Sequence, residues 1–290
     1  MKDRDLYRIC PICEAGCGLR VTMHGDTIVR IRGNDDDRFS EGHLCPKGVA
    51  LAALHSDPRR VQEPRIRDES GTRTASWHEA FAVAAKRLSE VRRQYGNDAV
   101  AIYIGNPSAH NVGLGMGLGV FAGHLGSRNL YSAASVDQMP KQLASELMFG
   151  NDMAVPVPDI EHTDFLLMLG ANPVVSNGSL WMVPKFRDKV RALHARGGRL
   201  VVVDPRRTET ARFADQHIGL RPGSDAWLLA ALINALIHSG LELPATYSTH
   251  GLQELLSSLA GIEIEEAGRR TGLSVLLSKI GWCWIKCAIA

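Results

Sequence analysis

The sequence lacks a long hydrophobic run, because no stretch reaches the roughly 18 apolar residues that a membrane-spanning helix requires. It also lacks an excess of charge of either sign: 33 Lys and Arg side chains are balanced by 31 Asp and Glu side chains, for a net charge of +2. Balanced charge gives no reason to expect a nucleic acid or another polyanion as a partner. The sequence therefore predicts no membrane span and no nucleic-acid binding.

Cysteine is scarce as well, since six residues in 290 do not make a disulfide framework. Only nine residues precede Cys10, which leaves no room for a secretory or twin-arginine signal. We therefore expect a cytoplasmic protein. With 45% hydrophobic and 22% charged residues, the composition is that of a globular chain with room for two domains.

Four of the six cysteines form one motif. Cys10, Cys13 and Cys17 lie within eight residues, and Cys45 follows after a gap of 27. A structural zinc site usually divides its ligands two and two, whereas a close triplet with one distant partner suits a [4Fe–4S] cluster. The spacing predicts an iron–sulfur cluster, with zinc as the alternative.

The residues around these cysteines fit a cluster. Gly16 and Gly18 permit positive φ, so the loop can wrap an inorganic core and aim N–H groups at its sulfurs. Pro46 stiffens the chain after the last cysteine, and Lys47 places a positive charge beside an anionic cluster.

The next segments are short. Residues 19–23 and 27–31 read as two strands joined by a His-Gly-Asp turn, a hairpin that would shield the cluster. Residues 34–37 read as a solvated turn rather than a metal site. Residues 49–75, rich in Pro, Arg and Asp, are expected to form a connector.

A helix is well marked from Ser76, which forms a capping box with Glu79, and Gly96 is placed to end it. Its apolar face is made of Trp77, Phe81, Ala84, Leu88, Val91 and Tyr95. Residues 99–105 follow as a buried strand. The alternating glycines at 113–119 do not match G-x-G-x-x-G, so they favour close helix packing over a nucleotide loop.

The second half contains a strand at 164–170, a helix at 184–196 and a strand at 199–204. This order is a βαβ unit, which makes the two strands parallel with a right-handed crossover. Their carboxyl ends therefore lie on one edge of the sheet, the edge where open α/β sheets bind ligands.

Two polar groups are predicted to converge at that edge. Gly170 and Asn172 offer backbone amides and a side-chain amide after the first strand. Asp204 offers a carboxylate for ribose or guanine after the second strand, and Arg206 offers a cation for phosphate. Residues 221–225 precede an apolar helix at 226–238, whose first turn could receive an anion. Taken alone, Asp225 is better explained as the N-cap of that helix.

These motifs resemble the molybdopterin oxidoreductases of the dimethyl sulfoxide reductase, formate dehydrogenase and nitrate reductase superfamily. The resemblance covers roughly residues 5–275. It rests on the cysteine motif with its Pro-Lys-Gly, on Ser-Trp-His-Glu-Ala at 76–80, Tyr-Gly-Asn-Asp-Ala-Val at 95–100, Gly-Ala-Asn-Pro at 170–173, Val-Val-Asp-Pro-Arg-Arg-Thr-Glu-Thr at 202–210 and Pro-Gly-Ser-Asp-Ala at 222–226.

The resemblance implies a [4Fe–4S] cluster and a molybdopterin guanine dinucleotide carrying molybdenum or tungsten. It also implies a small-molecule redox substrate and an electron-transfer partner protein, with Lys47 on the electron route between cluster and pterin. The implied dinucleotide contacts are Asn172, Ser176, Asp204, Arg206, Gly223 and Asp225.

The chain departs from the family pattern at the metal. The segment 128–138, which corresponds to the one supplying a metal ligand, contains no cysteine, so an oxygen from Ser132, Ser135 or Asp137 is the candidate, or the metal has no protein ligand. Each of the two serines is better explained as a backbone-bonding loop residue. The missing cysteine–histidine pair counts against formate as the substrate.

We expect an α/β protein: a small iron–sulfur domain with a hairpin at 1–60, the first part of an α/β domain at 61–128, and a dinucleotide-binding domain with a mainly parallel, Rossmann-like sheet at 129–274. Residues 275–290 form an atypical tail, and family subunits are much longer, so we expect an N-terminal fragment that is inactive alone. The alternatives are a non-catalytic iron–sulfur electron-transfer or assembly module and a zinc-stabilised dinucleotide dehydrogenase.

Overall fold

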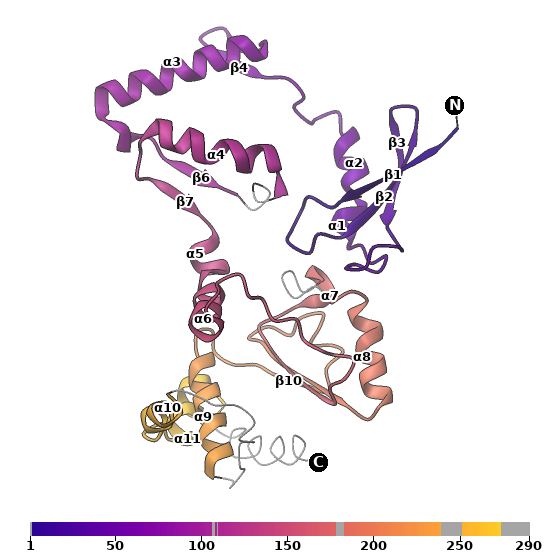
Figure 1. The fold of residues 1–290 in the computed structure, drawn as a ribbon, viewed down its shortest axis with the longest axis vertical. Helices are drawn as coiled ribbons and strands as arrows, with labels where there is room; N and C mark the ends of the chain where they lie inside the picture. The colour runs from indigo at the N-terminus through magenta and orange to yellow at the C-terminus, as the bar shows by residue number, and fades with distance from the viewer. Residues whose placement is uncertain (1, 106–107, 109, 178–182, 239–250, 274–290) are drawn as a thin grey trace. The chain divides into compact units, whose positions relative to one another are not determined.

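The computed structural model describes residues 2–105, 108, 110–177, 183–238 and 251–273. The chain divides into two compact units, and Figure 1 shows the course of the chain through them. The first comprises Met1–Pro158 and Ser176–Lys185, and the second comprises Asp159–Val175 and Phe186–Ala290. Both combine helices and strands, which confirms the predicted α/β class. The expected tail at 275–290 lies outside the described residues.

The first unit begins with a three-stranded antiparallel sheet in the order β1-β2-β3, formed by β1 (Arg4–Ile9), β2 (Gly18–His24) and β3 (Thr27–Gly33). The predicted hairpin is therefore confirmed, and β1 adds a strand that we did not predict. The buried residues here are Cys10, Ala15, Cys17, Leu19, Val21 and Ile31. The hydrophobic core of this sheet thus includes two cysteines of the motif.

The prediction that residues 49–75 form only a connector was wrong. After α1 (Pro46–Val49), the chain forms α2 (Leu51–Ser56), which packs on β3, and an antiparallel hairpin of β4 (Arg65–Asp68) and β5 (Gly71–Thr74). The hairpin strands are almost entirely exposed. An exposed strand buries no alternating face, so its sequence carries no hydrophobic period to detect.

Helix α3 (Trp77–Tyr95) has the predicted caps. The Ser76 hydroxyl accepts a hydrogen bond from the Glu79 N–H at 3.2 Å, and Gly96 follows the last turn at φ 86°. Its apolar face is uncovered, since Trp77 is 63% exposed. The capping prediction is therefore confirmed, whereas the amphipathic face does not contribute to a core in this structure.

Strand β6 (Ile102–Ile104) pairs in parallel with β7 (Leu130–Ser132), and α4 (Val112–Leu125) joins them. The strand predicted at 99–105 is thus shorter than expected, and it is not buried, because Tyr103 is largely exposed. The alternating glycines lie within α4, as expected. The expected close packing was wrong, because a Cβ atom on Gly115, Gly117 or Gly119 would meet no other described residue within 4 Å. Helices α5 (Ala134–Asp137) and α6 (Met139–Phe149) follow.

The second unit is built on a parallel sheet in the order β10-β9-β8, with β8 (Phe165–Leu169), β9 (Arg199–Val203) and β10 (Gln216–Ile218). Helix α8 (Phe186–Ala195) is the crossover between β8 and β9, and it lies beside the sheet in Figure 1. The predicted βαβ unit is confirmed. The helix begins later than Pro184, because Lys185 has a left-handed φ of 52°. A short helix, α7 (Pro173–Ser176), lies between β8 and α8.

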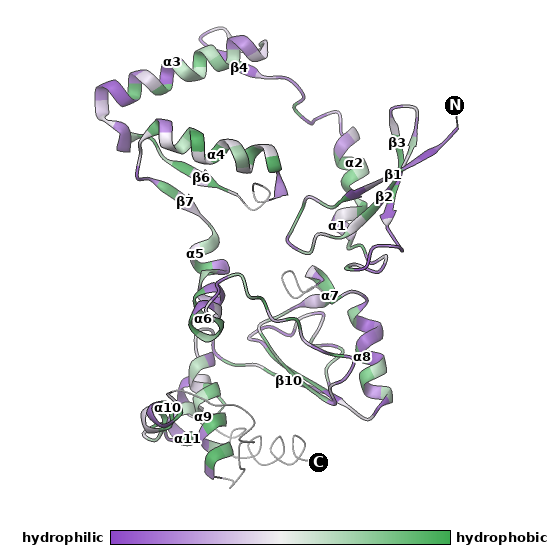
Figure 2. Cartoon of the chain, in the orientation of Figure 1, coloured by the Kyte–Doolittle hydropathy of each residue, from purple (hydrophilic) through white to green (hydrophobic). Residues whose placement is uncertain are grey.

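The core of this unit lies between the sheet and two further helices, α9 (Asp225–His238) and α11 (Ile264–Thr271), with α10 (Leu252–Leu259) between these two in the chain. Helix α9 is hydrophobic along most of its length (Figure 2). The Asn234 side chain donates hydrogen bonds to the carbonyls of Leu259 and Ile262 at 2.7 and 2.9 Å, which holds α10 to α9. The clustered core residues are Val201, Val203, Ile218, Leu220, Leu228, Ala231, Ala267 and Leu273. Within the described residues, no helix is both long and apolar enough to cross a membrane.

Candidate functional site

The cysteine triplet lies in a loop closed by two antiparallel strands. The β1–β2 ladder ends where Ile9 pairs with the first residue of β2, and the Cys10 N–H donates to the Cys17 carbonyl at 2.9 Å. Between them, the Gly16 N–H donates to the Cys13 carbonyl at 3.2 Å, and Gly16 has φ 54°. The sheet thus brings the backbones of the three cysteines to one end, and the positive φ expected at Gly16 is confirmed.

Gly18 is required for a different reason from the one we expected. Its φ is not positive; instead, a Cβ atom at this position would lie 2.6 Å from the Cβ of Asp37. The Asp37 carboxylate accepts from the Ser40 N–H at 2.7 Å and its hydroxyl at 2.6 Å, and Ser40 Oγ accepts from the Gly18 N–H at 3.1 Å. The Ser40 hydroxyl is the main cause of the lowered pKa of Asp37. Asp37 is thus a structural residue, so the solvated-turn interpretation of 34–37 was wrong for it.

The fourth cysteine reaches this region from the N-terminus of α1. The Cys45 carbonyl accepts hydrogen bonds from the N–H groups of Gly48 and Val49 at 3.0 and 3.3 Å. Gly48 is buried against the Leu44 side chain. These contacts fix the start of α1 and therefore the position of Cys45.

The four thiols affect one another electrostatically. Burial is the main cause that raises the pKa of both buried thiols, and the pKa of Cys17 reaches about 11. The neighbouring cysteines contribute to both increases, while Lys47 lowers the pKa of Cys10 and the Asn177 hydrogen bond lowers that of Cys17. Without a metal the two buried thiols are protonated at neutral pH, so a bound cationic centre must displace their protons.

This donor set fits an iron–sulfur cluster. All four cysteines are free thiols, of which two are buried and two are partly exposed. Lys47 lies close enough to Cys10 to lower its pKa. Among the described residues, no group of three His, Cys, Asp or Glu side chains is arranged to hold a metal ion as the side chains stand. The fit therefore depends on thiol chemistry, burial and charge.

The segment Ser176–Lys185 belongs to the same unit as the cysteines. Asn177 is 3% exposed with φ 54°, and its Nδ2 donates to Cys17 Sγ at 3.8 Å. Burial lowers the pKa of His43, and Lys185 lowers it further. We did not predict a role for Asn177. The only signal in the sequence was an Asn-Gly pair, which indicates a turn and no more.

A second candidate site lies at the carboxyl edge of the parallel sheet. Gly170, at φ 62°, donates its N–H to the Val203 carbonyl at 2.9 Å. Asn172 Oδ1 accepts from the Thr210 hydroxyl at 2.7 Å and from its N–H at 3.2 Å, and Asn172 Nδ2 donates to Glu209 at 2.9 Å. The loops after β8 and β9 thus meet as predicted, and the Asn172 side chain joins them.

Asp204 is buried at the end of β9. Its Oδ1 accepts from the Arg206 N–H at 2.8 Å, and its carbonyl oxygen lies 2.9 Å from His217 Nε2. The Arg206 guanidinium lies 3.6 Å from Glu209 and is mostly exposed. The carboxylate is therefore held by its own turn, and the guanidinium is accessible to an anion.

The remaining predicted residues lie at helix ends. Gly223 has φ 76°, and Asp225 is the exposed first residue of α9. The N-cap interpretation of Asp225 was wrong, because Ser224 precedes the helix and its carbonyl accepts the first helical N–H groups. Ser224 Oγ donates to the Arg221 carbonyl at 2.6 Å. Ser176 is the last residue of α7.

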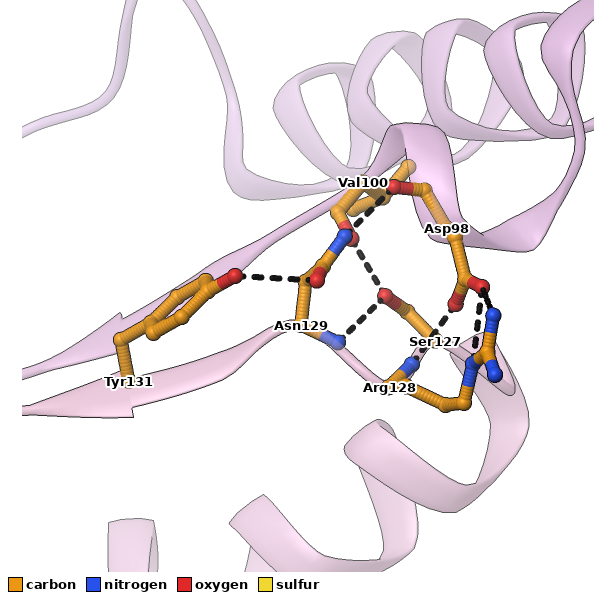
Figure 3. A network of polar contacts seen from close by, with 6 residues as sticks. All are labelled: Asp98, Val100, Ser127, Arg128, Asn129 and Tyr131. Carbon is orange, nitrogen blue, oxygen red and sulfur yellow. Dashed lines mark hydrogen bonds and ion pairs between the residues drawn. The ribbon is translucent and has the colours of Figure 1, made fainter.

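A network of polar contacts holds the start of the predicted metal segment (Figure 3). The Asp98 carboxylate accepts from the Arg128 backbone N–H at 2.8 Å and from its guanidinium at 2.7 Å. Asn129 Nδ2 donates to the Asp98 carbonyl at 2.7 Å, and the Tyr131 hydroxyl donates to Asn129 Oδ1 at 3.0 Å. Ser127 Oγ donates to the Val100 carbonyl. These bonds anchor the chain entering β7.

The three oxygen-bearing candidates in this segment are all exposed. Ser132 Oγ accepts from the Ala134 N–H at 3.2 Å, which is the backbone-bonding role that we considered for the serines. Ser135 and Asp137 lie on α5. All three candidates therefore follow the network of Figure 3 within six residues of Tyr131 in the sequence, and Ser132 is engaged in a turn.

Comparison with known families gives two matches. Residues 60–247 match the family described as Molybdopterin oxidoreductase, and residues 8–56 match the Molybdopterin oxidoreductase Fe4S4 domain. These matches confirm the resemblance and the predicted cofactors, a [4Fe–4S] cluster and molybdopterin, and they favour this interpretation over the two alternatives.

Curated relatives include formate dehydrogenase H of Escherichia coli (strain K12), 29% identical over 280 residues, which cover 93% of this chain and 38% of that protein. A nitrate reductase of Klebsiella oxytoca is 30% identical over 240 residues, covering 80% and 26% respectively. The chain thus spans less than two fifths of these relatives. Among solved structures, acetylene hydratase from Pelobacter acetylenicus aligns with a TM-score of 0.72 and 22% identity over 95% of this chain and 38% of that one, which shows the shared fold.

Proposed function

Because the chain belongs to the molybdopterin oxidoreductase family, we propose that it forms the cluster-binding part and a portion of the pterin-binding part of a redox enzyme. The complete enzyme moves two electrons between a small-molecule substrate and a molybdenum or tungsten centre, and passes them singly to a partner protein. The bound pterin and cluster supply the redox chemistry. The residues of this chain bind these groups, exclude water and set the local charge.

In this proposal Cys10, Cys13, Cys17 and Cys45 are the cluster ligands. The hydrogen bond from the Cys10 N–H to the Cys17 carbonyl holds the backbone of the first three cysteines, and the start of α1 holds that of Cys45. Burial of Cys10 and Cys17 excludes water from one side of the cluster, which affects its reduction potential. Lys47 supplies a positive charge that favours the thiolate form of Cys10 and the more negative, reduced cluster.

The carboxyl edge of the parallel sheet holds the pterin as its guanine dinucleotide. Asp204 offers a carboxylate for a ribose hydroxyl or a guanine N–H, and Arg206 offers an exposed guanidinium for phosphate. The Gly170 N–H is already donated to the Val203 carbonyl, so Gly170 shapes this edge through its left-handed backbone. Asn172 acts on this site by joining its two loops. Gly223 and Asp225 lie at the start of α9, and Ser176 lies at the end of α7.

The segment containing Ser132, Ser135 and Asp137 holds the candidate oxygen ligands for the metal in this proposal. Their exposed oxygens are hard donors of the kind that molybdenum accepts. We place the enzyme in the cytoplasm, where free thiols such as these four stay reduced. Subcellular fractionation with an antibody to this chain tests the location.

The single observation that carries the proposal is the set of four free cysteines, three of which belong to one hydrophobic cluster, with Lys47 lowering the pKa of Cys10. The test is anaerobic purification with iron, molybdenum, zinc and pterin quantified. We expect cluster absorption and about four irons per chain. Cys13→Ser should lose most of both, whereas the control Cys283→Ser, outside the motif, should keep them.

The rival outcomes are distinct. Stoichiometric zinc without iron, after expression with iron supplied, would contradict the cluster. Iron without molybdenum or pterin in the full-length polypeptide would favour a non-catalytic electron-transfer module. Turnover is measured in the full-length polypeptide, and we expect this chain alone to hold the cluster and to be inactive.

A further inference from the structure

Asn177 makes a contact that the proposed ligand roles do not explain. Its side-chain amide nitrogen lies 3.8 Å from Cys17 Sγ, a distance at which an N–H group donates to sulfur. Both residues are buried, with exposures of 3% and 4%. The contact joins residues 160 positions apart in the chain. Local turn formation therefore does not produce it.

We propose that Asn177 is a positioning residue of the iron–sulfur cluster, whose amide donates a hydrogen bond to the Cys17 ligand and raises the reduction potential of the cluster. This inference rests on the proposed role of Cys17 as a ligand. It assigns to a residue outside the cysteine motif a share in setting the driving force for electron transfer.

The direction of the effect follows from charge. Adding an electron makes the cluster and its thiolates more negative, and an N–H group that points at a thiolate stabilises the more negative state. The bond is also stronger where water is excluded, as it is at a buried sulfur. Loss of the donor should therefore make reduction harder and the potential more negative.

The orientation of the amide follows from the same chemistry. A metal-bound thiolate has no proton and can only accept, so the amide must turn its nitrogen toward Cys17. The Asn177 oxygen is then buried with no partner among the described residues. A buried unpaired oxygen is unfavourable, so the orientation has to be stabilised by the contact with sulfur.

A purely structural explanation accounts for less. Asn177 has a left-handed φ of 54°, which Asn adopts more readily than most residues. Backbone geometry alone would be served as well by Gly, which has no amide to bury. The turn alone therefore does not explain why a carboxamide is buried with its nitrogen beside a thiol.

The test measures the potential of the cluster in anaerobically purified, cluster-loaded protein by redox titration. Asn177→Gly keeps the left-handed backbone and removes the donor, and Asn177→Asp keeps the shape and replaces the donor with a carboxylate. We expect the reduction equilibrium to weaken about tenfold in Asn177→Gly, or about 59 mV for one electron, and further in Asn177→Asp. Asn151→Gly, an exposed loop residue whose Oδ1 accepts from the Met153 N–H, is the control and should match the wild type.

A second measurement does not depend on how stable the variants are. In wild-type protein labelled with 15N-asparagine, the reduced cluster should show a weak nitrogen coupling and an exchangeable proton coupling by pulsed electron paramagnetic resonance. Full iron content with unchanged potentials in both variants, or the absence of these couplings in the wild type, would overturn the inference. A wild type without iron would instead contradict the proposed cluster itself.

Discussion

Replacing Asn172 with Ala should loosen the carboxyl edge of the parallel sheet. The substitution removes three hydrogen bonds, two accepted from Thr210 and one donated to Glu209. Thr210 is 0% exposed, so its N–H is left buried without an acceptor. An orphaned buried donor costs about 1–3 kcal/mol, and the lost hydroxyl bond adds about 1 kcal/mol. We therefore expect a destabilisation of ~2–4 kcal/mol.

The assay should follow this edge locally, because the two compact units need not unfold together. Native-state hydrogen exchange of the Thr210 amide reports its own opening, and 2 kcal/mol corresponds to roughly thirtyfold faster exchange. A double-mutant cycle with Thr210→Val should give a coupling energy of about 1 kcal/mol or more. Asn151→Ala, at an exposed loop, should change stability by less than about 0.5 kcal/mol.

The result that would refute this reasoning is unchanged protection of the Thr210 amide in Asn172→Ala. If cofactor content fell while protection stayed intact, Asn172 would act on the dinucleotide directly and not by joining the loops.

Two further predictions concern the cysteine region. In cluster-free protein, Cys17 with a pKa of about 11 is ~0.1% thiolate at pH 8, whereas a thiol with the ordinary pKa of 9.0 is ~10% thiolate. Alkylation of Cys17 by iodoacetamide should therefore be about 100-fold slower, and its rate should increase about tenfold per pH unit. Peptide mapping by mass spectrometry measures this rate, and a Cys17 rate equal to that of an unburied thiol would contradict the burial. Gly18→Ala should destabilise the cysteine-binding sheet by about 1–3 kcal/mol, because the new Cβ meets Asp37. Chemical denaturation should compare the stability of this variant with that of Gly115→Ala, which places its Cβ in open space on α4 and should be neutral or stabilising. Equal stability of the two variants would rule out the close approach of Gly18 to Asp37.

The features that could be predicted from the sequence are those encoded by neighbouring residues. The hairpin of β2 and β3, the Ser76 cap of α3 and the β8–α8–β9 unit each follow from a local period and a local stop signal. Strands β4 and β5 could not be found, because they are exposed and show no apolar alternation. The buried strand predicted at 99–105 failed for the opposite reason: its residues are apolar, yet Tyr103 lies at the surface.

At the candidate sites, the sequence indicated which residue types gather and missed how they are held. The cysteine spacing predicts four ligands, but Asp37 and Ser40, which support Gly18, are ordinary loop residues in the sequence. Asn172 was predicted as a ligand contact, and only the structure shows its amide engaged with Thr210. Asn177 depends on a contact between distant parts of the chain, and no local pattern reports such a contact.

The sequence separation of the Asn177–Cys17 contact also determines when this contact can form as the chain is synthesised. Cys10 and Cys17 are seven positions apart, whereas Asn177 lies 160 positions from Cys17. Because the entropy of closing a loop grows with the logarithm of its length, the distant contact costs about 3 kcal/mol more to form. A chain emerging from the ribosome therefore closes the neck of the cysteine loop early, while the residue that covers Cys17 has yet to be synthesised. On this order, we expect iron that enters during synthesis to meet Cys17 before the Asn177 amide covers it.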